Sequence, residues 1–193
     1  MSEYGPLNWN GDEHDVALGV AKHITLDIND LHPSAWCYWQ ALEGPGSLWG
    51  LLQTPLVYGT SPFAVDIKKQ YYVMMQFMRW IRPGFKVYRN EGLRDFLVTA
   101  VNPLGSTVVI VLTNTGSSNK DIEYDLSEVA PRLRGLNIQV APFRTSRTEN
   151  HVALPVLNFP KHVLEIRAVA KSITTLVVSS LNNEHVEVFE KVH

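Results

Sequence analysis

The residues best suited to chemistry lie in two short stretches near the start of the chain. Glu3 places a carboxylate in the first, and residues 35 to 43 bring Trp39, Gln40 and Glu43 together in the second. Proteins often hold a sugar ring with such a set, because an indole stacks on the C–H face of the ring while polar groups bind its hydroxyls. The two stretches therefore indicate a carbohydrate site.

Several longer motifs are distributed along the chain. They are Ser2-Glu3-Tyr4-Gly5, residues 30 to 40 (DLHPSAWCYWQ), residues 69 to 77 (KQYYVMMQF), Ile81-Arg82-Pro83-Gly84, residues 143 to 150 (FRTSRTEN) and residues 171 to 175 (KSITT). Together they resemble the C-terminal part of family 30 glycoside hydrolases, and within that family the fungal endo-β-1,6-galactanase-like proteins. The resemblance runs nearly end to end.

This resemblance implies a retaining glycosidase whose nucleophile is the glutamate of the seventh barrel strand, here Glu3. In such an enzyme one carboxylate attacks the anomeric carbon, while a second, about 5 to 5.5 Å away, protonates the leaving oxygen. Neither Glu13 nor Glu43 matches the acid/base motif of the family. We therefore expect this chain to be a fragment of a longer enzyme and to be inactive, or to aggregate, when it is made alone.

The resemblance also assigns substrate-binding roles. Trp39 matches the ring-binding position of the family and is the expected sugar platform. Tyr4, Gln40 and Trp49 are candidates for substrate contact or for packing, and Glu43 either binds a sugar hydroxyl or is a loop charge.

The elements that must position these residues can be read from periodicity. Apolar residues recur every four positions between residues 14 and 31, which predicts an amphipathic helix with Asp12 as its N-cap and its end at His32-Pro33. Ala35 to Ala41 is predicted to be a strand parallel to the first stretch, and a loop follows to residue 61. A second helix is predicted from about 67 to 81, with Tyr71, Met74, Met75, Met78 and Ile81 on its buried side.

After Gly84 the pattern changes to short apolar runs separated by turns. Six strands are predicted, at residues 96–101, 108–112, 122–126, 138–143, 163–168 and 173–179. Their spacing favours an antiparallel β-sandwich. The fold class is thus mixed: residues 1–84 are expected to be the last two strands and helices of a partial β/α (TIM) barrel, and residues 85–193 a β-sandwich.

Composition excludes several other classes. The net charge of −2 and the absence of a basic block argue against a nucleic-acid partner. The seven histidines show no paired ligand spacing, so no metal and no cofactor are expected. Cys37 is interpreted as a small core residue, and no apolar run is long enough to span a membrane.

Two functions remain open from the sequence. The first is a retaining glycosidase acting on a polysaccharide, with β-1,6-galactan implied by the resemblance, in an intact parent that is extracellular. The second is a non-catalytic unit in which residues 85–193 act as a supporting or carbohydrate-binding sandwich. A sugar-binding sandwich would present exposed aromatic rings, whereas this half has few aromatic residues and most of them are embedded in apolar runs.

Overall fold

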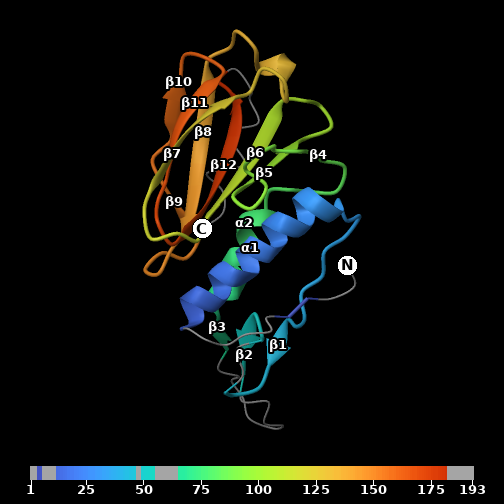
Figure 1. Cartoon of the computed structure of the whole chain (residues 1–193), viewed down its shortest axis with the longest axis vertical. Helices are drawn as coiled ribbons and strands as arrows, with labels where there is room; N and C mark the ends of the chain where they lie inside the picture. The colour runs from blue at the N-terminus through green and yellow to red at the C-terminus, as the bar shows by residue number, and fades with distance from the viewer. Residues whose placement is uncertain (1–3, 6–11, 47–48, 55–64, 182–193) are drawn as a thin grey trace.

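The computed structural model describes residues 4–5, 12–46, 49–54 and 65–181, and this part of the chain is mostly sheet with few helices (Figure 1). The helices are α1 (Glu13–Leu31) and α2 (Lys69–Met78), with a short 3₁₀ helix, η1 (Pro131–Leu133). The strands are β1 (Leu42–Glu43), β2 (Leu52–Gln53), β3 (Asp66–Ile67), β4 (Lys86–Tyr88), β5 (Leu97–Val101), β6 (Thr107–Asn114), β7 (Lys120–Asp125), β8 (Ile138–Thr145), β9 (Val152–Ala153), β10 (Leu157–Phe159), β11 (Val163–Ala168) and β12 (Ser172–Ser180).

Helix α1 follows the predicted pattern closely. The Asp15 N–H donates to Asp12 Oδ1 at 3.0 Å, so Asp12 is the N-cap as predicted. At the other end His32 adopts a left-handed conformation and Pro33 follows, which ends the helix where the sequence places the stop. Leu31, the last residue of the helix, is 61% exposed, because it lies two positions after the buried Asn29 and so faces the opposite side of the last turn.

Helix α2 forms where predicted, but its buried face differs from the prediction. The buried residues are Gln70, Val73, Gln76 and Phe77, whereas Met78 is 53% exposed. Gln76 can be buried because its amide donates to Thr145 Oγ1 at 2.8 Å and its carbonyl oxygen accepts from Thr175 Oγ1 at 2.6 Å. An apolar pattern could not identify this face, since two of its residues are glutamines.

Within the described residues, seven strands form one antiparallel sheet in the order β10-β8-β12-β6-β5-β4, with β9 paired to β8. All six predicted strands are present, while the short strands β4, β9 and β10 were missed. The central strand β12 is buried along all nine residues, since it lies between β6 and β8 and both faces of the sheet are covered.

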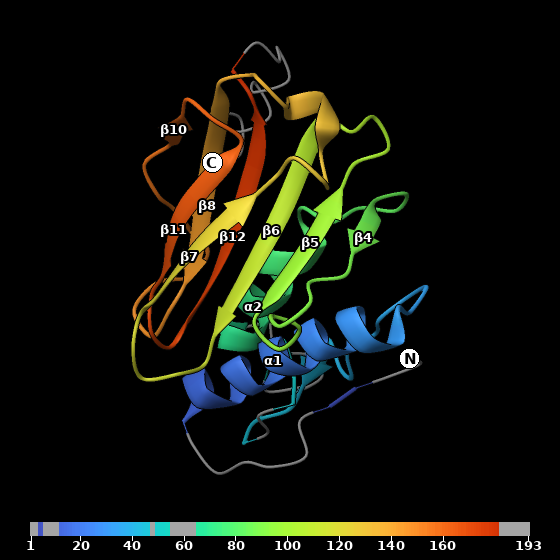
Figure 2. The same ribbon diagram turned by 45° about the horizontal axis from the view of Figure 1, so that its top comes forward.

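Different elements pack on the two faces of this sheet. The antiparallel pair β7 and β11 packs on one face, where Ile110, Leu164 and Leu176 belong to one apolar cluster. Helices α1 and α2 lie on the other face, where Val109 and Val111 contact the helices (Figure 2). This second cluster contains residues from both sides of position 85. Residues on both sides of this boundary therefore share one apolar cluster. The division into a barrel remnant (1–84) and a sandwich (85–193) stays a prediction.

Buried polar contacts fix the helices on the sheet. Thr25 Oγ1 lies 2.8 Å from Thr113 Oγ1 of β6, and Asn29 Nδ2 of α1 donates to the Leu97 carbonyl oxygen at 2.8 Å. Together with the Gln76 contacts, these bonds define the register of each helix against the strands, because a shifted helix would leave buried polar groups unpaired.

The stretch from 35 to 41 is not the continuous strand that was predicted. It forms a single bridge, between Tyr38 and Tyr4, and the regular pairing in this region belongs to β1, β2 and β3. Cys37, interpreted as a core residue, is exposed. The prediction assumed cover on both faces of this stretch, whereas in the described residues α1 covers the side where Trp36 and Tyr38 pack.

Candidate functional site

The two stretches singled out in the sequence lie side by side and run in the same direction. Tyr4 and Tyr38 form a parallel bridge, and the Trp39 N–H donates to the Tyr4 carbonyl oxygen at 2.7 Å. The peptide bond that joins Trp39 to Gln40 is cis. Glu3 lies outside the described residues. Tyr4, which follows Glu3 in the sequence, is therefore held directly beside Trp39.

Side chains alternate along the second stretch. Trp36 and Tyr38 turn toward α1 and are partly buried there, while Cys37 and Trp39 turn away and are exposed. Trp39 is 50% exposed, so about half of its surface is accessible to a ligand. Such a ring is suited to stacking on a sugar.

The aromatic rings on the α1 side form a contiguous group. The Tyr4 and Trp36 ring centroids lie 5.4 Å apart, and those of Trp36 and Tyr38 lie 6.4 Å apart. His23 of α1 lies against Tyr4, with 4.9 Å between the ring centroids. This group packs behind the bridge, on the side away from Trp39.

Trp49 packs closely against Gly5, the residue after Tyr4. A Cβ on Gly5 would lie 2.5 Å from the Trp49 ring and 3.2 Å from the Trp39 carbonyl oxygen. Any larger residue at position 5 would therefore displace the indole or the backbone. Gly5 was missed as a site residue, although it belongs to the Ser-Glu-Tyr-Gly motif, because its role depends on a contact with a residue far along the chain.

Gln40 and Glu43 form a polar pair next to Trp39. Gln40 Nε2 donates to Glu43 Oε2 at 2.6 Å, and the Gln40 carbonyl oxygen accepts from the Leu51 N–H at 3.1 Å. Both side chains are half-buried. The described candidates Tyr4, Trp39, Gln40, Glu43 and Trp49 are thus linked by a continuous series of contacts.

Burial sets the ionisation of the two tyrosines. Burial, with a smaller effect of the Asp27 charge, raises the pKa of Tyr4 to about 12. Burial also raises the pKa of Tyr38, and its hydroxyl has no hydrogen-bond partner among the described residues. Both phenols are therefore neutral near pH 7 and cannot act as anionic bases there.

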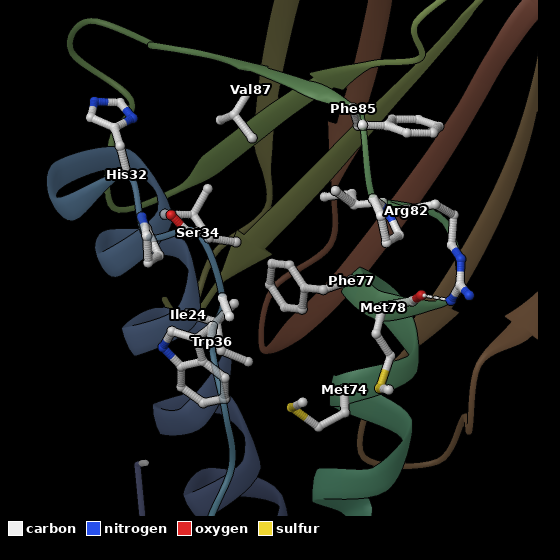
Figure 3. Close-up of a pocket in the computed structure, with 16 residues that line it drawn as sticks. Ile24, His32, Ser34, Trp36, Met74, Phe77, Met78, Arg82, Phe85 and Val87 are labelled. Carbon is white, nitrogen blue, oxygen red and sulfur yellow. Dashed lines mark hydrogen bonds between the residues drawn. The ribbon is translucent and has the colours of Figure 1, made fainter. Parts of the chain in front are cut away.

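A separate groove of about 720 Å³ lies between the helices, behind Trp36. Figure 3 shows its apolar wall, to which Ile24 of α1 and Met74 and Phe77 of α2 contribute, while Arg82 donates to the Met78 carbonyl oxygen at 2.8 Å. Trp39 does not line this groove, so it is distinct from the carbohydrate site that the sequence indicates.

No cluster of three or more His, Cys, Asp or Glu side chains within the described residues is arranged to hold a metal ion. In the same part of the chain, no helix is long and apolar enough to cross a membrane.

Comparison with known proteins gives a consistent result. No family model matches the chain. Over 150 residues the chain is 29% identical to an endo-β-1,6-galactanase from Hypocrea rufa, a match that covers 76% of this chain and 29% of that protein.

Solved structures of two bacterial enzymes share the fold. A glycoside hydrolase family 30 subfamily 8 xylanase from Clostridium acetobutylicum superposes with a TM-score of 0.70 at 20% identity, covering 93% of this chain and 42% of that one. A family 30 endoxylanase from Clostridium papyrosolvens gives a TM-score of 0.67 at 22% identity, with 93% and 41% covered. The resemblance to family 30 glycoside hydrolases is confirmed, and the chain spans less than half the length of these relatives.

Proposed function

We propose that this chain is the C-terminal part of a retaining glycoside hydrolase of the family 30 type, with Glu3 as its nucleophile. The observation that carries the proposal is the hydrogen bond from the Trp39 N–H to the Tyr4 carbonyl oxygen. This bond holds the residue next to Glu3 beside an exposed indole. The reaction needs a nucleophilic carboxylate close to the bound sugar, together with a second carboxylate that protonates the leaving oxygen.

Alternation of side chains supports the same assignment. Tyr4 packs toward α1, as do Trp36 and Tyr38, whereas Trp39 turns to the opposite side. The proposal requires the carboxylate of Glu3 to lie on the side of Trp39. There it would attack the anomeric carbon of a sugar stacked on the indole, and a second carboxylate would protonate the leaving oxygen.

Polar contacts to the sugar are assigned to Gln40 and Glu43. Their hydrogen bond of 2.6 Å holds the Glu43 carboxylate in place next to Trp39. A carboxylate fixed in this way can accept hydrogen bonds from sugar hydroxyls. Tyr4 and Trp49 complete the proposed substrate-binding set, Trp49 through its close contact with Gly5.

The architecture that we propose is a barrel remnant followed by a sandwich. The parallel bridge between Tyr4 and Tyr38, with α1 between them in the chain and packed beside them, is a feature of a β/α barrel. The antiparallel sheet with β7 and β11 on one face supports a sandwich for residues 85–193. We assign the sandwich a supporting role, since every aromatic side chain in residues 85–181 is at least partly buried.

For the substrate we propose β-1,6-linked galactan, on the basis of the Hypocrea rufa relative. Xylan is the competing polysaccharide, because the structurally similar enzymes are xylanases. We also propose that the intact enzyme acts outside the cell, where such polymers occur. The chain alone is expected not to hydrolyse galactan, because no glutamate in it matches the acid/base motif.

A chimera tests this proposal. The chain replaces the matching segment of the Hypocrea rufa galactanase, which supplies the remaining part of the barrel. We expect the chimera to cleave β-1,6-galactan in preference to xylan, and Glu3→Gln to reduce the rate by at least ~10³-fold. The exposed Glu128→Gln is the matched control and should retain the rate. An active chimera that is unaffected by Glu3→Gln contradicts the assignment of the nucleophile.

A further inference from the structure

Helix α1 presents two polar side chains to the back of the proposed site. His23 and Asp27 are four residues apart, so they lie on the same face of the helix. The His23 ring lies 4.9 Å from the Tyr4 ring, and Asp27 Oδ2 accepts the Trp36 Nε1–H at 2.8 Å. The sequence gives no sign of this arrangement, because the partners of both residues lie outside the helix.

The Asp27 contact fixes the orientation of the Trp36 indole. Trp36 is partly buried, and its ring forms part of the wall of the groove next to Ile24 (Figure 3). The same ring lies between Tyr4 and Tyr38, at centroid distances of 5.4 and 6.4 Å. These tyrosines are the two residues that form the parallel bridge. The indole therefore packs across both stretches that carry the site.

We propose that Asp27 is a positioning residue for the glycosidase site, acting through Trp36 on the pairing between Tyr4 and Trp39. This inference rests on the proposed function for its catalytic consequence. Without the carboxylate, the indole can turn, and its contacts with the Tyr4 and Tyr38 rings that support the bridge are weakened. The distance between the nucleophile and the sugar platform then varies, and a misplacement of about 1 Å can reduce a rate by 10²-fold.

The test separates Asp27 from the surrounding helix with three variants of the full chain. Asp27→Leu keeps the branched shape of the side chain and removes the acceptor, while Asp27→Asn keeps an amide oxygen that can still accept the indole N–H. Asp30→Asn is the matched control, because this carboxylate lies on the same helix but pairs at 3.5 Å with Arg94 on the surface.

The direct readout is hydrogen exchange at the backbone N–H of Trp39, which donates to Tyr4. We expect Asp27→Leu to accelerate this exchange by about tenfold or more, while amides of the buried strand β12 keep their rates. Asp27→Asn should restore most of the protection and Asp30→Asn should change nothing. Unchanged exchange at Trp39 in Asp27→Leu, or equal acceleration in β12, overturns the inference.

A double-mutant cycle tests the route through the indole. Trp36→Phe keeps an aromatic ring but lacks the N–H donor, so Asp27→Leu should have no further effect on Trp39 exchange in that background. Additive effects would show that Asp27 acts by another path and would overturn the inference.

Covalent labelling of Glu3 by an activated glycosyl fluoride supplies the catalytic readout. For Asp27→Leu we expect the maximal labelling rate to fall about tenfold or more with an unchanged half-saturating concentration. An unchanged maximal rate overturns the catalytic part of the inference. Absence of label in the unmodified chain contradicts the proposed function instead, and the exchange experiment then still decides the structural role of Asp27.

Discussion

The carbonyl oxygen of Tyr4 accepts a hydrogen bond of 2.7 Å from the N–H of Trp39, a residue 35 positions later in the chain. The bond joins the two stretches that contain the candidate nucleophile and the candidate sugar platform. Its direction is that of neighbouring parallel strands, because Tyr4 also bridges Tyr38 in parallel. The proposed chemistry depends on this contact more than on any other in the described part of the chain.

Gly5→Ala should disrupt the site without unfolding the protein. The added methyl would lie 2.5 Å from the Trp49 ring, so the indole or the backbone of residues 4 and 5 must move. We expect a loss of stability of about 1 to 3 kcal/mol and an altered tryptophan fluorescence spectrum.

Gly19→Ala is the matched control for this substitution. A Cβ on Gly19 meets no atom within 4 Å, and the residue lies in the exposed part of helix α1. Alanine there should raise stability by about 1 kcal/mol, because it favours the helix. A Gly5→Ala protein as stable as the unmodified chain, with the same fluorescence, would contradict the packing described for Trp49.

Gln76→Leu should be more destabilising than its similar volume suggests. The substitution leaves the hydroxyls of Thr145 and Thr175 buried without their amide partner. We expect the free energy of unfolding in urea to fall by about 2 to 3 kcal/mol. Thr175→Val should cost less in this background than in the unmodified chain, since one of the two hydrogen bonds from its hydroxyl to residue 76 is already lost. If the two losses simply add, the network is not the cause.

Stability should depend on pH through His151. Burial, together with the charge of Arg79, lowers the pKa of His151 from 6.5 to about 4, and both ring nitrogens are buried without a partner among the described residues. The ring stacks on Phe143 at a centroid distance of 5.2 Å, and Trp80 lies next to it.

The sign follows from the direction of this shift. Between pH 6.5 and 4 the unfolded chain binds a proton at His151 that the folded protein does not, so stability falls as the pH falls through this window. The loss should reach roughly 2 to 3 kcal/mol near pH 4. Asn suits the left-handed backbone at position 151 (φ 53°), so His151→Asn should remove this part of the pH dependence. An unchanged slope in urea titrations of this variant would assign the effect to other groups.

Much of the fold could be predicted because its elements obey local rules. The N-cap at Asp12, the stop at His32-Pro33 and the six main strands follow from capping, proline geometry and alternation. Strands of two or three residues, such as β4 and β9, were missed, because so short a run has no period to detect.

The predictions were wrong where tertiary contacts determine which residues are buried. The buried face of α2 contains Gln70 and Gln76, and only the threonines on β8 and β12 explain why Gln76 can be inside. Cys37 was placed in a core because both faces of its stretch were assumed to be covered. Motif resemblance predicts Trp39 as the sugar platform, whereas the contacts of Gly5 and Asp27 could be recognised only from their distant partners.

The central claim is that Glu3 is a catalytic nucleophile, and covalent labelling tests it most directly. The full chain is incubated with a 2-deoxy-2-fluoro-β-galactosyl fluoride, whose fluoride can leave without a proton donor, so the test does not need the acid/base residue. Digestion and mass spectrometry then locate the sugar. We predict one galactosyl adduct on the peptide that contains Glu3, and none in Glu3→Gln. An adduct on Glu13 or Glu43, or no adduct at all, would contradict the account.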